Sequence, residues 1–137
     1  MKNRTLLREV AVKVLYQVYI LEKTNVKFDV DSLIKDQMEV ENEFVNNLVH
    51  GTLSRQKEIT KLANRYLENW TIDRLSKVDK AILSVGIYEL LYTKTPCIVS
   101  INETIELSKI YSDEEVSDMI NACMDKIYKT EDLHGKE

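Results

Sequence analysis

Glycine, proline and cysteine are scarce in this sequence, and each shortage excludes a class of structure. Its 137 residues include three glycines and one proline, which is few for a protein of many short strands and tight turns. Cys97 and Cys123 stand singly and the two histidines are far apart, so no metal site is expected. We therefore expect an all-α protein with reduced thiols, no metal and no cofactor.

Long apolar runs and glycine-rich loops are also missing. No uninterrupted apolar run approaches the roughly 18 residues of a membrane-spanning helix, and the N-terminus has no run typical of a secretory signal. The scattered glycines cannot form the loop of a Walker or dinucleotide-binding motif. We expect a cytoplasmic protein that does not enter membranes.

Acidic residues outnumber basic ones, so indiscriminate coating of nucleic acid is not expected. The formal net charge is −4 at pH 7. The charges are unevenly distributed, because the first 13 residues hold Lys2, Arg4, Arg8 and Lys13 against the single acid Glu9. The sequence therefore permits a local basic patch at the N-terminus of an acidic protein.

The stretch from Leu75 to Tyr92 predicts the central helix of the fold. Its apolar side chains cover most of a helical circumference, so neighbours must pack on most sides. Thr71 is the expected N-cap, and Pro96 forbids continuation. Glu89 lies on the apolar arc, and we expect a buried carboxylate rather than a catalytic acid. Its expected donors are backbone amides, a basic side chain or the Ser100 hydroxyl.

Residues 4–22 predict a first helix with an apolar stripe and a basic edge. The stripe consists of Leu7, Ala11, Val14, Leu15 and Val18. Arg4 and Arg8 lie along its edge, and the same side continues through Val12 to Tyr16 and Tyr19. Guanidinium groups beside flat rings can pair with phosphates and stack on bases. Surface arginines with snorkelling tyrosines explain the same pattern, and the residues alone leave both interpretations open.

Shorter patterns predict the other helices. Residues 24–40 are expected to form a loop with a short helix near 32–35. Two helices, or one bent helix, are expected over 42–69, with Gly51 as the break.

Two serines stand at capping-box spacing before the last two predicted helices. Ser100 precedes Glu103 by three residues, and Ser112 precedes Glu115 by three. These pairs predict the N-terminal ends of those helices. The last nine residues are expected to form a frayed tail.

Catalytic groupings are not visible in the sequence. A nucleophile beside a base, a carboxylate pair, a metal set or a phosphate cradle would be needed. Two single histidines and two single cysteines make no recognisable dyad. We expect a protein that is not an enzyme, and the alternative is a small helical enzyme built on buried arginines and glutamates.

Three segments together resemble one protein family. They are REVAVKVLYQ (8–17), VDKAILSVGIYEL (78–90) and VSINETIELSK (99–109), supported by FVNNLVHGTL (44–53) and NACMDKI (121–127). Their order and spacing fit across nearly the whole chain, and INETIELSK and YEL are the most specific parts. On these segments the chain resembles the NusB family of transcription antitermination factors.

The resemblance implies one all-helical domain, 1–137, with about seven helices in two packed bundles. Their expected ranges are about 1–68 and 71–130, followed by a tail over 131–137. Members of this family are not enzymes. They bind boxA, a short unpaired RNA element in nascent ribosomal RNA leaders, together with the ribosomal protein NusE in a complex on RNA polymerase. Some relatives form homodimers through the basic helix.

The resemblance also implies binding residues. The RNA-contacting set is Lys2, Arg4, Arg8, Lys13, Tyr16, Tyr66 and Met119. Asp79 matches the acidic position expected to contact the ribosomal partner. With about three phosphate contacts to single-stranded RNA, the slope of log affinity against log salt should be only about −2. A partner protein is therefore expected to strengthen binding.

The alternative is a purely protein-binding helical module without RNA affinity. This alternative is motivated by the negative net charge and by the small number of basic residues in the N-terminal segment. The same fold also forms the front part of ribosomal RNA cytosine methyltransferases. Since the sequence shows no cofactor-binding domain, catalysis of that kind is not expected.

Overall fold

Helix α5 (Lys77–Tyr92) lies at the centre of the computed structural model, which describes residues 3–133. All ten residues from Ala81 to Leu90 are buried. Helices α1, α3, α4, α6 and α7 all pack against α5. The prediction of a central helix covered on most sides is confirmed.

Seven α-helices and one 3-10 turn account for the regular structure of residues 3–133. The helices are α1 (Arg4–Leu21), α2 (Val30–Gln37), α3 (Glu43–Ser54), α4 (Gln56–Tyr66), α5, α6 (Cys97–Tyr111) and α7 (Glu114–Thr130), and the 3-10 turn is η1 (Ile72–Arg74). No strand occurs in this described range. The all-α prediction is confirmed.

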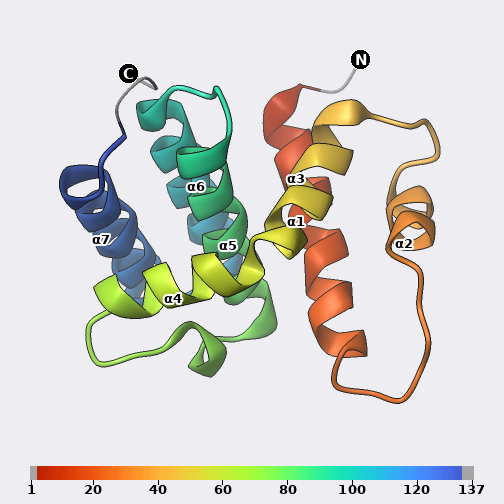
Figure 1. Ribbon diagram of the computed structural model, residues 1–137, viewed down its shortest axis with the longest axis horizontal. Coiled ribbons are helices and arrows are strands. Elements are labelled where there is room, and N and C mark those ends of the chain that lie inside the picture. Colours follow the sequence, from red (N-terminus) through yellow and green to blue (C-terminus); the bar gives the residue numbers. More distant parts are fainter. Residues whose placement is uncertain (1–2, 134–137) are drawn as a thin grey trace.

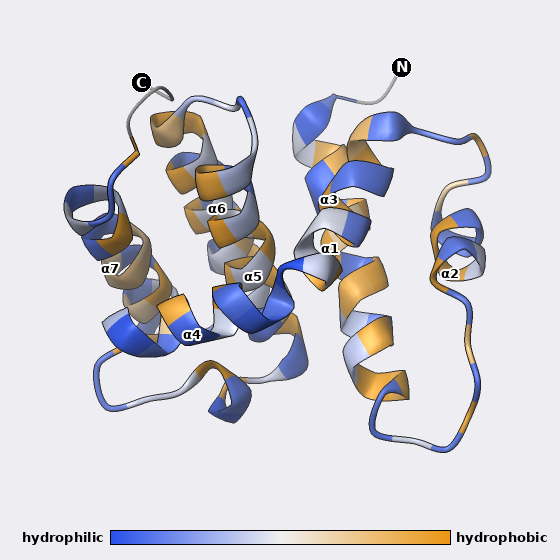
Figure 2. Cartoon of the chain, in the orientation of Figure 1, coloured by the Kyte–Doolittle hydropathy of each residue, from blue (hydrophilic) through white to orange (hydrophobic). Residues whose placement is uncertain are grey.

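The helices form two neighbouring groups that α4 connects. Figure 1 shows α1, α2 and α3 on one side and α5, α6 and α7 on the other. Helix α4 crosses from the end of α3 and packs against α5 and α7. Hydrophobic and hydrophilic segments alternate along the helices (Figure 2), as expected where helices bury one face against their neighbours. The predicted division into bundles near residues 68–71 stays a prediction.

The start of α5 lies later than the sequence pattern predicts. Ser76 caps it by accepting a hydrogen bond from the Asp79 backbone N–H at 3.2 Å. Thr71 instead precedes the short turn η1. A serine one residue before the helix satisfies a free N–H of its first turn, which fixes the boundary there.

Both capping-box predictions are wrong. Helix α6 begins one turn early, after Pro96, whose φ of −55° suits a helix start, and Ser100 is buried inside that helix. At α7 the cap is Asp113, whose Oδ1 accepts from the Val116 N–H at 3.0 Å. The carboxylate also interacts favourably with the positive end of the helix dipole, whereas Ser112 turns towards α5.

Gly51 does not break the chain between α3 and α4. The break is at Arg55, and Gly51 lies inside α3 against the ring of Tyr88 from α5. A Cβ atom at position 51 would lie 2.1 Å from Tyr88 Cζ. Glycine is therefore required for the close approach of α3 to α5, which places the start of α3 beside the end of α5.

No helix among residues 3–133 has the length and apolar character needed to cross a membrane. This same range contains no group of three or more His, Cys, Asp or Glu side chains arranged to hold a metal ion. Cys97 and Cys123 are both buried, and neither forms a disulfide bond within the described residues. Burial raises the pKa of Cys123 to about 12, so this thiol acts as a core side chain.

Gly51→Ala should lower the free energy of unfolding by about 1–3 kcal/mol, because the new methyl group overlaps Tyr88. Urea denaturation followed by circular dichroism measures this change. In a Tyr88→Ala background the same substitution should cost little or stabilise the protein, since alanine favours helix over glycine by about 1 kcal/mol. An equal loss in both backgrounds would show that the Tyr88 ring is not the cause.

Candidate nucleic-acid interface

Helix α1 turns one face into the core and the other towards solvent. Its first turn is capped by Asn3, whose Oδ1 accepts from the Leu6 N–H at 3.0 Å. The inner face contains the whole predicted stripe, Leu7, Ala11, Val14, Leu15 and Val18, all buried. The predicted inner face of α1 is confirmed.

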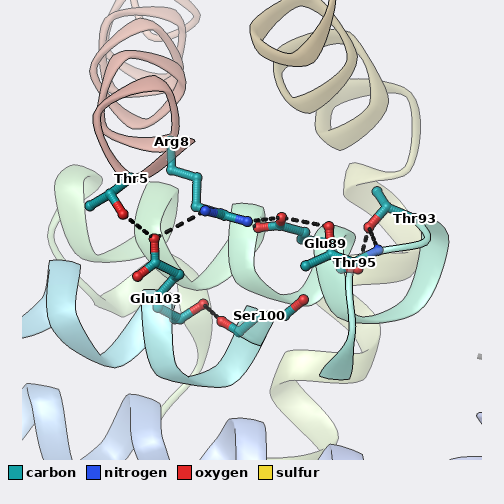
Figure 3. A network of polar contacts seen from close by, with 8 residues as sticks. Thr5, Arg8, Glu89, Thr93, Thr95, Ser100 and Glu103 are labelled. Carbon is teal, nitrogen blue, oxygen red and sulfur yellow. Dashed lines mark hydrogen bonds and ion pairs between the residues drawn. The ribbon is translucent and has the colours of Figure 1, made fainter. Parts of the chain in front are cut away.

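The Arg8 side chain lies inside the protein and not on the exposed basic edge predicted for α1. It crosses from α1 to α5, where Nε and Nη2 donate to the two carboxylate oxygens of Glu89 at 2.8 and 2.6 Å (Figure 3). Arg8 is 4% exposed and Glu89 is 2% exposed. This bidentate pair is the geometry in which a guanidinium binds a carboxylate most strongly.

A second carboxylate completes the network from α6. Arg8 Nη1 donates to Glu103 Oε1 at 3.0 Å, and the Thr5 hydroxyl donates to the same oxygen at 2.6 Å. The Thr95 hydroxyl donates to Glu89 Oε2 at 2.9 Å. Burial alone would lower the pKa of Arg8. The two glutamates have the opposite effect, because they accept hydrogen bonds from Arg8 and carry negative charge, and the pKa of Arg8 is raised overall. One cation thereby joins α1, α5 and α6.

This network changes the prediction for Arg8 and settles that for Glu89. Glu89 is buried and hydrogen-bonded as expected, and the expected basic side chain is that of Arg8. The hydroxyl that donates to it belongs to Thr95 and not to Ser100. Arg8 was expected on an exposed basic edge, and this position is wrong, because its guanidinium is buried against two glutamates. The reason is that a carboxylate buried in α5 requires a cation, and α1 supplies it. Contact between Arg8 and RNA stays a prediction.

The remaining residues of the predicted basic edge separate around α1. Tyr19 is buried and donates its hydroxyl to Gln56 Oε1 at 2.5 Å. Lys13 is exposed, and Tyr16 is 41% exposed one turn further on. Arg4 is exposed as well, but nine helical positions separate it from Lys13, so the two point in opposite directions. The structure thus keeps Lys13 and Tyr16 together and turns Arg4 towards α3.

Tyr66 and Met119 are brought together between α4 and α7. They line a cleft of about 290 Å³. The Tyr66 hydroxyl donates to Glu131 Oε2, and this hydrogen bond raises the pKa of Tyr66. Three further acids and one lysine line the cleft, Glu68, Glu115, Asp118 and Lys126. This cleft lies away from the N-terminal end of α1 (Figure 1), and its acidic lining disfavours phosphate.

Asp79 is also largely enclosed. It is 7% exposed and accepts a hydrogen bond from the Ser112 hydroxyl, which ties α5 to the α6–α7 junction. A contact between Asp79 and a partner protein stays a prediction. Lys2, the first predicted RNA contact, lies outside the described residues.

A family comparison decides what kind of protein this is. The NusB family model matches residues 5–129. The chain belongs to the NusB family. Two relatives are the transcription antitermination proteins NusB of Halalkalibacterium halodurans, 38% identical over 95% of this chain and 98% of that protein, and of Listeria monocytogenes, 40% identical over 88% and 91%. Membership of this family confirms the prediction of a non-enzymatic protein.

Solved NusB structures share the fold. NusB of T. maritima superposes with a TM-score of 0.80 at 27% identity, over 94% of this chain and 92% of that one. A crystal structure of the antitermination factors NusB and NusE in complex with dsRNA superposes with a TM-score of 0.78 at 26% identity, over 93% and 97%. The family resemblance and the helical architecture expected from the sequence are both confirmed.

The residues that contact Arg4, Arg8 and Glu89 could not be identified from the sequence. Glu103 was interpreted as half of a capping box, and Thr95 was assigned no role. Phe44, whose ring centroid lies 4.6 Å from Arg4 Cζ, had no assigned role. The available signal was the buried position of Glu89, which requires a cation from another helix, but periodicity does not show which one.

Arg8→Ala should lower the free energy of unfolding by about 3–5 kcal/mol, because Glu89 would remain buried without its cation. Urea denaturation measures this loss. The matched control is Arg4→Ala, which removes an exposed guanidinium from the same helix and should cost less than about 1 kcal/mol. Equally small losses in both variants would contradict a structural role for Arg8.

Proposed function

We propose that this NusB-family protein binds boxA-type single-stranded RNA in nascent ribosomal RNA leaders together with NusE. In this proposal the pair joins an antitermination complex on RNA polymerase in the cytoplasm. Two findings support it: relatives are named as transcription antitermination proteins, and a similar NusB was crystallised with NusE and dsRNA.

The main support for the proposal is that Lys13 and Tyr16 are both exposed on the solvent-facing side of α1, here called the outward row. Lys13 and Tyr16 lie one turn apart on this row, and Lys13 forms no ion pair with any residue between 3 and 133. Its ammonium group is therefore available to a phosphate. The exposed ring of Tyr16 offers a stacking surface to an unpaired base. Phosphate contact positions the strand, and contacts to base edges select its sequence.

A partner protein follows from the small number of available cations. With Arg8 buried, the exposed basic residues predicted for RNA contact in the described range are Arg4 and Lys13. Each phosphate contact to a single strand adds only about 0.7 to the salt slope, so the chain alone should bind RNA weakly. NusE bound to the same strand would raise the effective concentration of both proteins on the RNA.

A protein-binding adaptor without RNA affinity is the second candidate, and the acidic cleft favours it. Glu68, Glu115 and Asp118 surround Tyr66 and Met119 with negative charge, which suits a basic protein segment better than RNA. Pairing of two copies through α1 would cover Lys13 and Tyr16 and compete with RNA. A direct measurement of RNA binding distinguishes the adaptor and the paired form from the main proposal.

Fluorescence anisotropy with a labelled boxA-type RNA and a scrambled RNA, each with and without NusE, tests the proposal. Lys13→Ala should weaken binding about fourfold near 0.15 M salt and reduce the salt slope by about 0.7. Tyr16→Leu should weaken binding about fivefold or more through lost stacking. Lys35→Ala, an exposed lysine on α2, is the matched control and should bind normally.

Equal affinity for the boxA-type and scrambled RNAs, even with NusE present, would support the protein-binding adaptor instead. Normal RNA binding by both α1 variants would show that the assigned surface is wrong. Loss of binding by the Lys35 control as well would point to non-specific charge attraction.

A further inference from the structure

A second basic surface lies where three segments distant in sequence meet. A cleft of about 470 Å³ is bounded by the N-terminal ends of α1 and α3 and by the loop between α5 and α6. These three segments lie at the same end of the molecule (Figure 1). The residues that matter for its chemistry are Arg4, Phe44, Asn47, Thr93, Lys94 and Thr95.

Two exposed cations line this cleft. Arg4 comes from α1 and Lys94 from the α5–α6 loop, and neither forms an ion pair with another residue of the described range 3–133. Glu43 is the one acidic residue in the lining. The balance of charge therefore favours an anion, in contrast to the acidic cleft beside Tyr66.

Flat and hydrogen-bonding groups lie beside the cations. The Arg4 guanidinium lies over the Phe44 ring, with its carbon 4.6 Å from the ring centroid, and the Arg8 guanidinium carbon lies 5.3 Å from the same centroid. The outer face of the Arg4 guanidinium, supported by the ring, is the planar surface offered to a base. The Tyr88 hydroxyl donates to Asn47 Oδ1 at 3.0 Å, which orients the Asn47 amide and leaves its NH₂ group for a ligand acceptor. A base edge or a phosphate oxygen suits that donor.

The wall that carries Lys94 is held by the buried network. The Thr93 hydroxyl donates to the Glu89 carbonyl oxygen at 2.7 Å and accepts from the Thr95 N–H at 3.3 Å. The Thr95 hydroxyl in turn donates to the Glu89 carboxylate at 2.9 Å. The loop on both sides of Lys94 is thus fixed before any ligand arrives, which reduces the entropy lost on binding.

Another cation and ring adjoin the cleft along α5. Tyr92 immediately precedes Thr93, and its ring centroid lies 5.8 Å from that of Tyr88. The Arg55 guanidinium carbon lies 4.4 Å from the Tyr92 centroid. A single strand leaving the cleft along this direction would meet a further stacking surface with its own positive charge.

We infer that this cleft binds a nucleotide unit of single-stranded RNA, with its phosphate contacted by Lys94 and its base stacked on the Arg4 guanidinium that the Phe44 ring supports. The inference rests on the proposed function and adds a binding site away from the outward row of α1. An acidic protein segment could use the two cations, but would make no use of the ring and the oriented amide. RNA is therefore the ligand that the whole lining fits.

Anisotropy titrations with the labelled boxA-type RNA and NusE test the cleft. Lys94→Ala should weaken binding about fourfold near 0.15 M salt and reduce the salt slope by about 0.7. Phe44→Leu keeps an apolar side chain but removes the ring, and should weaken binding about fivefold or more. Lys35→Ala is the control, and circular dichroism checks that each variant is folded.

Crosslinking gives a readout that does not depend on affinity. RNA containing 4-thiouridine, irradiated in the complex, should attach to the tryptic peptide that carries Phe44, and the Lys94→Ala substitution should reduce this yield. If folded Lys94→Ala and Phe44→Leu bind RNA normally and no such crosslink forms, the cleft is not an RNA site, although the proposed function stands. If Lys94→Ala weakens NusE binding alone, the cleft binds protein and the inference is overturned.

A wild-type protein that binds neither RNA with NusE present would overturn the proposed function and the cleft together. The α1 variants separate the two cases. Weakened binding by Lys13→Ala with normal binding by Lys94→Ala rejects the cleft alone.

Discussion

The buried interaction of Arg8 with Glu89 and Glu103 fixes the relative positions of α1, α5 and α6. A carboxylate placed inside the central helix is costly to desolvate, and the bidentate guanidinium compensates that cost only when α1 has one position and one rotation. The same rotation turns Lys13 and Tyr16 outwards. Thr95 extends the network into the α5–α6 loop, so both candidate RNA surfaces are oriented by one buried cation.

The sequence allows much of this fold to be predicted because hydrophobic periodicity reflects burial directly. The apolar circumference of α5 and the stripe of α1 both predicted buried faces that the structure contains. Glu89 was recognisable as a buried carboxylate because it interrupts that periodicity. The exact helix starts were less predictable, because more than one residue near each start can cap a helix. Pro96 precedes α6 in place of Ser100, and Asp113 caps α7 in place of Ser112.

The candidate site was harder to predict, because its residues are distant in sequence. Arg8 looks like a surface residue beside Arg4, and only the position of Glu89, 81 residues later, draws its side chain inwards. The cleft beside Arg4 likewise combines α1, α3 and the α5–α6 loop, and Lys94 carries no sequence signal of its own. Tyr66 and Met119 line one cleft, yet acidic residues from α7 and from the segment after α4 give that cleft the opposite charge.

Arg8 orients the candidate RNA surfaces from inside the protein, so we expect that it does not itself contact RNA. The most direct test is an NMR titration of the ¹⁵N-labelled protein, with NusE present, by boxA-type RNA, following the Arg8 Nε–H signal. Because Glu89 holds the Arg8 Nε–H, we expect its signal to stay unchanged while the backbone signals of Tyr16 and Lys94 shift. An Arg8 Nε–H signal that shifts as strongly as those of Tyr16 and Lys94 would contradict this expectation.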